Sequence, residues 1–224
     1  MKKVESVIFD MDGVLFDTES IYLKVWKNVF KRYGYKMTKE IYSQVIATGR
    51  ENVKKVFLRE FGDDLSIEKM YKEKDALLKE EIEKHVPIKE GVVEILNILK
   101  NMNYKIALAT SSDRERMNKQ LEKAKIREYF DEVICRDEVE KTKPNPEIYI
   151  KAADKLDSNP KNCLVIEDSL AGVMAAYKAN MKVLHVEDLK KADNEIKKYC
   201  YKSFNNLHEI KENIVLNNKL LKGS

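Results

Sequence analysis

The chain has 224 residues, and its 42 Lys and Arg residues against 38 Asp and Glu residues give a net charge of +4. This length predicts a globular protein with one large domain, or with a main domain and a smaller accessory one. The two signs of charge are interspersed, and no basic arm or aromatic-basic stripe appears, which argues against nucleic-acid binding. The longest apolar runs are far shorter than the about 18 residues that a membrane span needs.

Cysteine usage and the first residues indicate a reduced setting. The chain has three cysteines, an odd number, and no CxxC pair. We therefore interpret Cys135, Cys163 and Cys200 as small core side chains. The chain starts with MKKVESVIFD, which lacks the long apolar run of a signal peptide. We therefore expect a cytoplasmic protein and, as to assembly, a monomer or a weak homodimer.

The first expected element is a strand over Ser6–Phe9. It is followed by a long stretch without a convincing strand, in which apolar residues recur at three- and four-residue steps and predict helices. These helices are expected over Thr18–Tyr33, Lys39–Ala47, Glu51–Glu60 and Ile67–Lys84. We interpret residues 15–86 as a helical insertion and Pro87 as part of a hinge, before a helix over Glu90–Met102 that returns to the sheet.

The second half of the chain carries further short apolar segments. Strands are expected over Lys105–Thr110, Glu132–Cys135, Cys163–Glu167 and Lys182–Val186. Each is followed by polar residues and a helical pattern, which is typical of parallel βα units, and runs such as KIALAT fit strands covered on both faces. The sequence thus predicts an α/β fold with a doubly wound, Rossmann-like parallel sheet, built from residues 1–14 and 87–224. We expect a segment at Tyr199–Tyr201 and a helix from about Asn206 to finish the sheet and cover its edge.

An acidic cluster follows the first strand, in the stretch VIFDMDGVLFDTES. Asp10 and Asp12 are two residues apart and so point the same way at the strand's C-terminal end, where open parallel sheets bind ligands. Gly13 then allows a sharp turn and a close approach to a ligand. The alternative is a cluster that caps the next helix, a role open to Asp17 or Thr18. Capping does not require two same-side carboxylates before a glycine.

A second acidic pair, Glu167 and Asp168, follows another strand in LVIEDSLAGV. Carboxylates at two strand ends would repel each other if they met, unless a divalent cation lay among them. Oxygen ligands select a hard ion such as Mg²⁺. The alternative is that Asp168 or Ser169 caps the helix that follows.

Two further features would complete a phosphate site. Thr110, Ser111 and Ser112 offer hydroxyl and N–H groups at a helix start, although such residues are also ordinary helix caps. In KTKPNPEIY, Lys143 supplies positive charge, with Pro144 and Pro146 fixing the loop around it, although a lysine is usually a solvent-exposed side chain.

The order DMDGV, ATSS, KPNPE and EDSLAG resembles the haloacid dehalogenase superfamily of phosphotransferases. The helical insertion resembles the small α-helical cap of its β-phosphoglucomutase and phosphoglycolate phosphatase-like members. The resemblance implies a Mg²⁺-dependent phosphatase that hydrolyses a small phosphorylated metabolite, a sugar phosphate or a phosphoglycolate-like acid. Residues 15–86 would be the cap.

The resemblance also implies roles for individual residues. Asp10 would be the nucleophile that forms an aspartyl-phosphate, and Asp12 would protonate the leaving oxygen and then activate water. Thr110 would hold the transferring phosphoryl group. Lys143 would balance the charge of the nucleophile and the phosphate.

For the metal, the resemblance implies Asp10, the backbone carbonyl of Asp12, and Asp168, with Glu167 acting directly or through water. Ser111 and Ser112 would assist in phosphate binding. The cap loop ATGRENV, Ala47–Val53, would present Arg50 to a distal phosphate or carboxylate of the substrate, the alternative being an ordinary surface arginine.

Two other functions stay open. In mutases of this family a histidine on the helix after the first motif shields the phosphoenzyme from water. This chain has Tyr22 at the corresponding position, which favours hydrolysis over a hexose-phosphate mutase activity. A phospho-receiver domain shares the acidic residues, the Ser or Thr and the Lys, but is about half as long and has no helical insertion.

Overall fold

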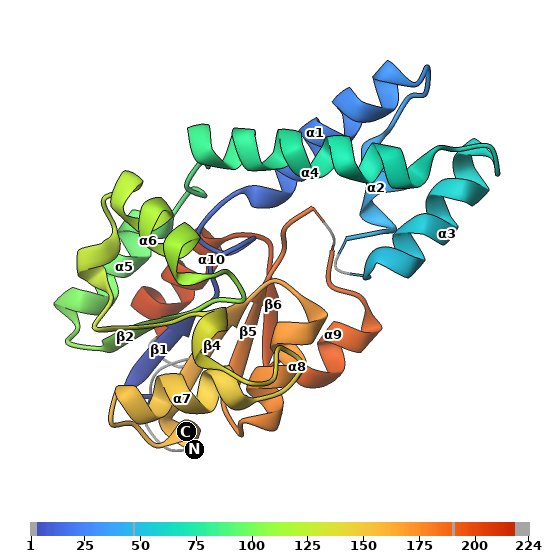
Figure 1. Ribbon diagram of the computed structural model, residues 1–224. Helices are drawn as coiled ribbons and strands as arrows, with labels where there is room; N and C mark the ends of the chain where they lie inside the picture. Colours follow the sequence, from blue (N-terminus) through green and yellow to red (C-terminus); the bar gives the residue numbers. More distant parts are fainter. Residues whose placement is uncertain (1–3, 47, 190, 218–224) are drawn as a thin grey trace. The chain divides into compact units, whose positions relative to one another are not determined.

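The computed structural model describes residues 4–46, 48–189 and 191–217, and the chain forms two compact units (Figure 1). One unit comprises Met1–Phe16 with Ile88–Ser224 and contains the sheet, and the other, Asp17–Pro87, is helical. The strands are β1 (Ser6–Phe9), β2 (Lys105–Ala109), β3 (Glu132–Ile134), β4 (Cys163–Glu167), β5 (Lys182–Val186) and β6 (Lys202–Phe204). The α-helices are α1 (Thr18–Arg32), α2 (Lys39–Ser43), α3 (Arg50–Phe61), α4 (Ile67–Lys84), α5 (Val92–Asn101), α6 (Arg114–Lys123), α7 (Glu147–Lys155), α8 (Leu170–Lys178), α9 (Asn194–Tyr199) and α10 (Leu207–Glu212).

Short 3-10 turns occur at Arg127–Tyr129, Arg136–Glu138 and Pro160–Asn162, and a π-helical turn occurs at Asn213–Asn217. Each helix among the described residues is too short or too polar to span a membrane.

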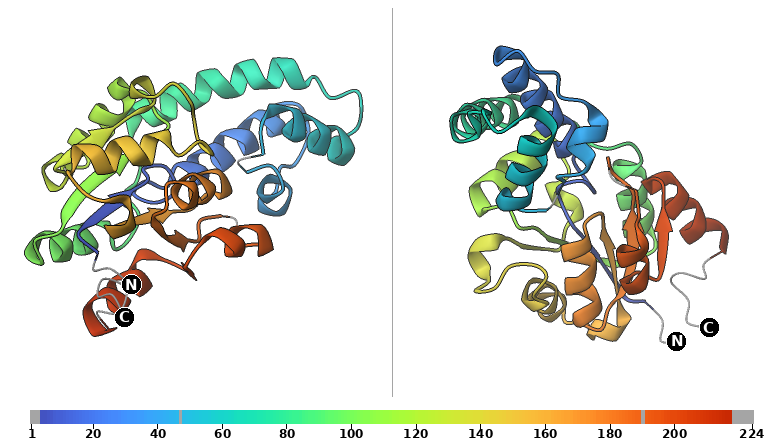
Figure 2. Two further views of the ribbon diagram at one scale, coloured as in Figure 1. Left: turned by 90° about the horizontal axis from the view of Figure 1, so that it is seen from below. Right: turned by 90° about the vertical axis from the view of Figure 1, so that its right-hand side faces the viewer.

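The sheet has the order β3-β2-β1-β4-β5-β6, and all its neighbouring strands are parallel. Ile8 in β1 lies opposite Ala107 in β2 and Val165 in β4. Helices α7, α8 and α9 cover one face, and α5 and α10 cover the other (Figures 1 and 2). This doubly wound α/β fold confirms the predicted fold class. Because the chain order reverses next to β1, the ends of β1 and β4 lie where ligands bind in such sheets.

Burial of the strands explains their sequences. Every residue of β1 and of β4 is buried, as expected for central strands with helices on both faces. The core between the sheet and α7, α8 and α9 is built from side chains such as Ile8, Val165 and Tyr149, none of which is exposed. The strands are therefore rigid supports for the polar residues that follow them.

Two predicted elements were wrong in their extent. The last strand is Lys202–Phe204 rather than Tyr199–Tyr201, because Asp193 caps α9 and Tyr199 is the final residue of that helix. Phe204, 3% exposed, is the apolar side chain that β6 buries, whereas Tyr201 is 56% exposed. Helix α2 ends at Ser43, before the β-branched pair Val45 and Ile46. Ala47, the predicted end of α2, lies outside the described residues.

The helical unit has its own aromatic core. The Trp26 ring on α1 lies 5.1 Å from that of Phe57 on α3 and 5.2 Å from that of Tyr71 on α4, measured between centroids. The two ends of this unit are joined where Asp17 N donates to Pro87 O at 2.9 Å. Within the sheet unit, Leu15 O accepts from Lys89 N, and Phe16 bridges to Ile88.

Candidate active site

The turn after β1 places a carboxylate at the centre of the sheet. Asp10 is 7% exposed, and its N–H donates to Ile166 O of β4 at 3.0 Å. Met11 O then accepts from both Leu15 N and Phe16 N, which closes a tight turn. Gly13 has a φ of 81°, and a Cβ there would overlap the Asp168 carboxylate. A glycine is therefore required both for the turn and for the close approach of Asp168.

Glu167 ends β4 and is almost entirely buried. Its Oε1 accepts from Lys143 Nζ at 2.9 Å and from Tyr149 OH at 3.2 Å. Its Oε2 accepts from Ser169 N at 2.7 Å and from Ser169 Oγ at 3.0 Å. A Cβ on Gly172 would overlap this carboxylate, so the glycine of α8 leaves room for it.

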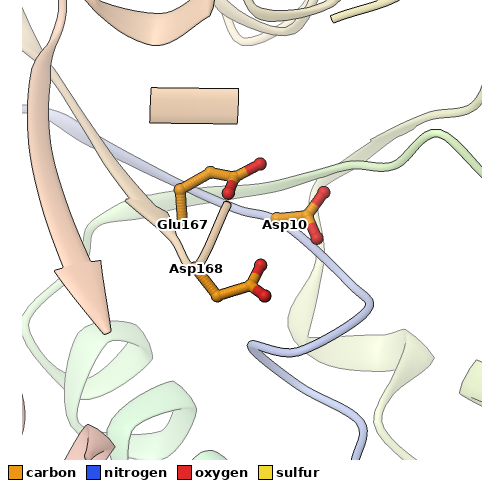
Figure 3. Close-up of side chains that lie close together, drawn as sticks. All are labelled: Asp10, Glu167 and Asp168. Carbon is orange, nitrogen blue, oxygen red and sulfur yellow. The ribbon is translucent and has the colours of Figure 1, made fainter. Parts of the chain in front are cut away.

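The carboxylates of Asp10, Glu167 and Asp168 converge, with ligand atoms all within 4.8 Å of one another (Figure 3). Burial raises the pKa of Asp10 to about 7, with Lys143 opposing and Glu167 reinforcing the shift. Burial, together with the charges of Glu167 and Asp10, raises the pKa of Asp168 well above its ordinary 3.8. A cation among them would favour the ionised forms. Oxygen donors at this spacing fit a hard divalent cation.

The ammonium group of Lys143 contacts this cluster. Its Nζ donates to Asp10 Oδ1 at 2.5 Å, to Glu167 Oε1 at 2.9 Å and to Ala109 O at 3.2 Å, and it lies 4.9 Å from the centre of the Tyr149 ring. Burial alone would lower the pKa of Lys143, but the charges of its acidic neighbours raise it well above 10.5. The alternative of a solvent-exposed lysine was wrong, because the side chain is 6% exposed.

The residues after β2 lie at the same end of the sheet. Thr110 is buried, and its Oγ1 accepts from Ser112 N at 3.0 Å. Ser112 Oγ donates to Asp12 Oδ2 at 2.9 Å, whereas Ser111 is exposed. None of the three caps α6, because Asp113 does, accepting from Arg116 N. Among the described residues no acceptor takes the Thr110 O–H, so this donor is available for another partner.

The helix-capping alternatives can also be tested at the starts of α1 and α8. Asp17 caps α1, where it accepts from Ser20 N, and Ser169 caps α8, where it accepts from Gly172 N. Neither Asp10 nor Asp168 caps a helix. Helix capping therefore does not explain the paired carboxylates.

Several residues that contact this site were missed by the sequence prediction. Arg116 Nη2 donates to Asp12 Oδ1 at 2.5 Å, and Lys89 Nζ donates to Gly13 O at 2.7 Å. His185 Nε2 lies 2.9 Å from Asp168 O, and its Nδ1 lies 2.7 Å from Ser203 Oγ. Burial lowers the pKa of His185, so its neutral form is favoured. These contacts join segments far apart in sequence, and no local pattern signals them.

The helical unit holds a cavity of its own, of about 390 Å³. Arg50, the first residue of α3, lines it, and its guanidinium carbon lies 4.3 Å from the centre of the Tyr71 ring. Tyr22 and Trp26 line the same cavity, and Lys74 Nζ lies 5.7 and 5.9 Å from the centres of their rings. Arg50 and Tyr22, the two residues singled out in this unit, thus share one aromatic-lined cavity.

The sequence of residues 7–186 matches the family of haloacid dehalogenase-like hydrolases. The chain belongs to this family. A phosphorylated carbohydrates phosphatase of Thermotoga maritima is 32% identical over 185 residues, which cover 81% of this chain and 84% of that protein. A β-phosphoglucomutase structure from Clostridium difficile has a TM-score of 0.67 at 25% identity and covers 96% of both chains.

The fold is shared more widely within the family. The structure of a family hydrolase from Deinococcus radiodurans, which holds phosphate and sodium, has a TM-score of 0.86 at 22% identity over 100% of both chains. Membership of the family confirms the resemblance inferred from the four motifs. It identifies the chain as an enzyme of a hydrolase family rather than a phospho-receiver domain.

Proposed function

We propose that this protein is a Mg²⁺-dependent phosphatase of small phosphorylated metabolites, acting through an aspartyl-phosphate on Asp10. The observation that carries the proposal is the contact of buried Asp10 with Lys143, beside the carboxylates of Glu167 and Asp168. The Thermotoga maritima relative, which is named as a phosphatase of phosphorylated carbohydrates, supports the choice of substrate class.

In the first step Asp10 attacks phosphorus, and the bond between phosphorus and the leaving oxygen breaks. Asp12 gives its proton to that oxygen and later takes a proton from the water that attacks the aspartyl-phosphate. Lys143 offsets the negative charge of Asp10 and of the transferring group. The hydroxyl of Thr110, with Ser111, holds the phosphoryl oxygens, whereas the N–H and hydroxyl of Ser112 already donate to Thr110 Oγ1 and Asp12 Oδ2.

The metal would be held by Asp10, by Asp168 and by the backbone carbonyl of Asp12. When bound, Mg²⁺ supplies positive charge that favours ionised Asp10 and neutralises the phosphoryl oxygens. Glu167 holds Lys143 in contact with the nucleophile through the hydrogen bond at Oε1.

Within this proposal the helical unit, residues 17–87, is a cap that recognises the leaving group. Its cavity is lined by the cationic side chain of Arg50 and by aromatic side chains such as Tyr22 and Tyr71. This lining suits a substrate with apolar faces and a second anionic group. Tyr22 replaces the histidine of the mutases, so hydrolysis is favoured. The likeness to the Clostridium difficile β-phosphoglucomutase keeps a mutase as the second candidate.

A panel of phosphate esters, assayed for phosphate release with Mg²⁺ and with a chelator, tests the proposal. Asp10→Asn should lose essentially all turnover, while Asp63→Asn, an exposed aspartate of the helical unit, should keep it. Rapid acid quenching should trap phosphate on the unchanged protein and not on Asp10→Asn.

Two results would contradict the proposal. One is the absence of phosphate release from every ester, and the other is full turnover by Asp10→Asn. Isomerisation of a hexose phosphate, primed by a bisphosphate and faster than phosphate release, would establish the mutase instead.

A further inference from the structure

Arg116 occupies an unfavourable position for a cation. It is the third residue of α6, and its backbone N–H donates to the capping residue Asp113 at 2.8 Å. The N-terminal turn of a helix carries partial positive charge and favours anionic side chains. The helix therefore gives no local reason for an arginine at this position.

The side chain of Arg116 is directed instead to Asp12. Nη2 donates to Asp12 Oδ1 at 2.5 Å, and the arginine side chain is 25% exposed. Its Nε is buried and has no hydrogen-bond partner among the described residues. An unsatisfied buried donor is destabilising. The arginine thus keeps its contact with Asp12 in spite of two unfavourable features of its own surroundings.

Asp12 is held at both of its oxygens. Arg116 donates to Oδ1, and Ser112 Oγ donates to Oδ2 at 2.9 Å. A carboxylate bound at one oxygen can still rotate about its side-chain bonds. Donors on both oxygens, from two side chains that flank the start of α6, fix the plane of the carboxylate as well as its position.

We propose that Arg116 is a positioning residue, which with Ser112 fixes the Asp12 carboxylate for proton transfer. The inference rests on the proposed function, in which Asp12 protonates the leaving oxygen. Proton transfer requires an acid within hydrogen-bond reach and correctly aligned. Arg116 does not touch the substrate in this proposal and acts only through Asp12.

Arg114 provides a matched control on the same helix. It pairs with Glu138 at 2.5 Å, and its side chain is 45% exposed. Arg114→Gln removes the same charge from the same turn of α6 as Arg116→Gln does. A general effect of charge on the helix or on phosphate attraction would appear in both variants, whereas an effect through Asp12 would appear only in Arg116→Gln.

The test compares two leaving groups. p-Nitrophenolate leaves without being protonated, whereas a sugar alkoxide must receive a proton as it leaves. The measured quantity is kcat/KM, which covers the steps up to the phosphoenzyme, for p-nitrophenyl phosphate and for the sugar phosphate that the unchanged protein hydrolyses fastest. Arg116→Gln should lower kcat/KM for the sugar phosphate by about 10–100-fold and for p-nitrophenyl phosphate by less than about threefold, since general acid catalysis acts on the former alone.

Arg116→Lys, which keeps a cationic donor, should recover part of the loss, and Arg114→Gln should behave as the unchanged protein. If Arg116→Gln does not fold, the same ratio of the two substrates is measured for Arg116→Lys, where a smaller difference of the same sign is expected. Equal losses for both substrates, or none for either, would overturn the inference. Failure of the proposed function would show separately, as the absence of phosphate release by the unchanged protein.

Discussion

Replacing Lys143 by methionine tests whether this lysine neutralises the buried carboxylates. Methionine has a similar length and no charge, so the variant leaves Asp10 and Glu167 without the cation that lies 2.5 and 2.9 Å from them. Removing one partner of a buried ion pair costs about 3–5 kcal/mol. We expect a loss of that size in the free energy of unfolding of the metal-free protein at about pH 8.

The pKa of Asp10 sets how this loss depends on pH. It is about 7 in the folded protein, against an ordinary value of 3.8, so the folded protein holds this proton more tightly than the unfolded chain does. The stability that this group contributes is complete below about pH 4 and is lost as the pH rises through 7. Below about pH 5 Asp10 is neutral in the folded protein, and Lys143 has less charge to offset. The loss caused by Lys143→Met should therefore be clearly smaller at pH 5 than at pH 8.

The assay is urea unfolding with a chelator present, followed by circular dichroism for the whole chain. Fluorescence of Trp26, the single tryptophan, follows the helical unit. Lys141→Met is the matched control, because Lys141 is an exposed lysine of the same loop. The double variant Lys143→Met/Glu167→Gln should recover part of the lost free energy of unfolding, because one of the two unpaired carboxylates is then uncharged.

The reasoning is refuted if Lys143→Met at pH 8 falls within about 0.5 kcal/mol of Lys141→Met, the range expected of a surface substitution. It is refuted equally by a loss that is the same at both pH values. Excess Mg²⁺ should reduce the loss, since the metal supplies the missing charge.

Two further predictions concern the supports of the carboxylates. In an ordinary helix interior, replacing glycine by alanine stabilises a protein by about 0.5–1 kcal/mol. Gly172→Ala should instead destabilise this protein, because the added Cβ overlaps Glu167. A gain in thermal stability would contradict this prediction. His185→Gln should weaken Mg²⁺ binding by about 10–100-fold, because His185 contacts the backbone oxygen of Asp168. The measurement is the Mg²⁺ concentration at which half of the increase in melting temperature is reached. His208→Gln, a histidine on α10, should leave this concentration unchanged, and equal effects of the two substitutions would count against the prediction.

The sheet and the residues at its strand ends could be predicted from the sequence because both follow from local pattern. Asp10 and Asp168 come directly after apolar runs, and parallel strands bring such ends together at one edge. The partners of these residues could not be predicted in this way. Arg116 and His185 reach the site through side chains from separate elements, and their own neighbours in sequence carry no signal of it. The prediction misplaced the edge strand β6 because it relied on the tyrosines of the segment. The position of this strand is decided by its pairing with β5, a long-range contact that the local sequence does not show.

The hydrogen bonds also distinguish the three carboxylates of Asp10, Glu167 and Asp168. Glu167 accepts two hydrogen bonds at each oxygen, so its acceptor capacity is filled by Lys143, Tyr149 and Ser169. Asp10 accepts from Lys143 at Oδ1 alone, and no described residue donates a hydrogen bond to the Asp168 carboxylate. A cation that displaced the partners of Glu167 would leave buried donors unsatisfied, whereas one bound by Asp10 and Asp168 would not. This difference supports the proposal that Asp10 and Asp168 bind the metal directly, with Glu167 acting through Lys143 and the start of α8.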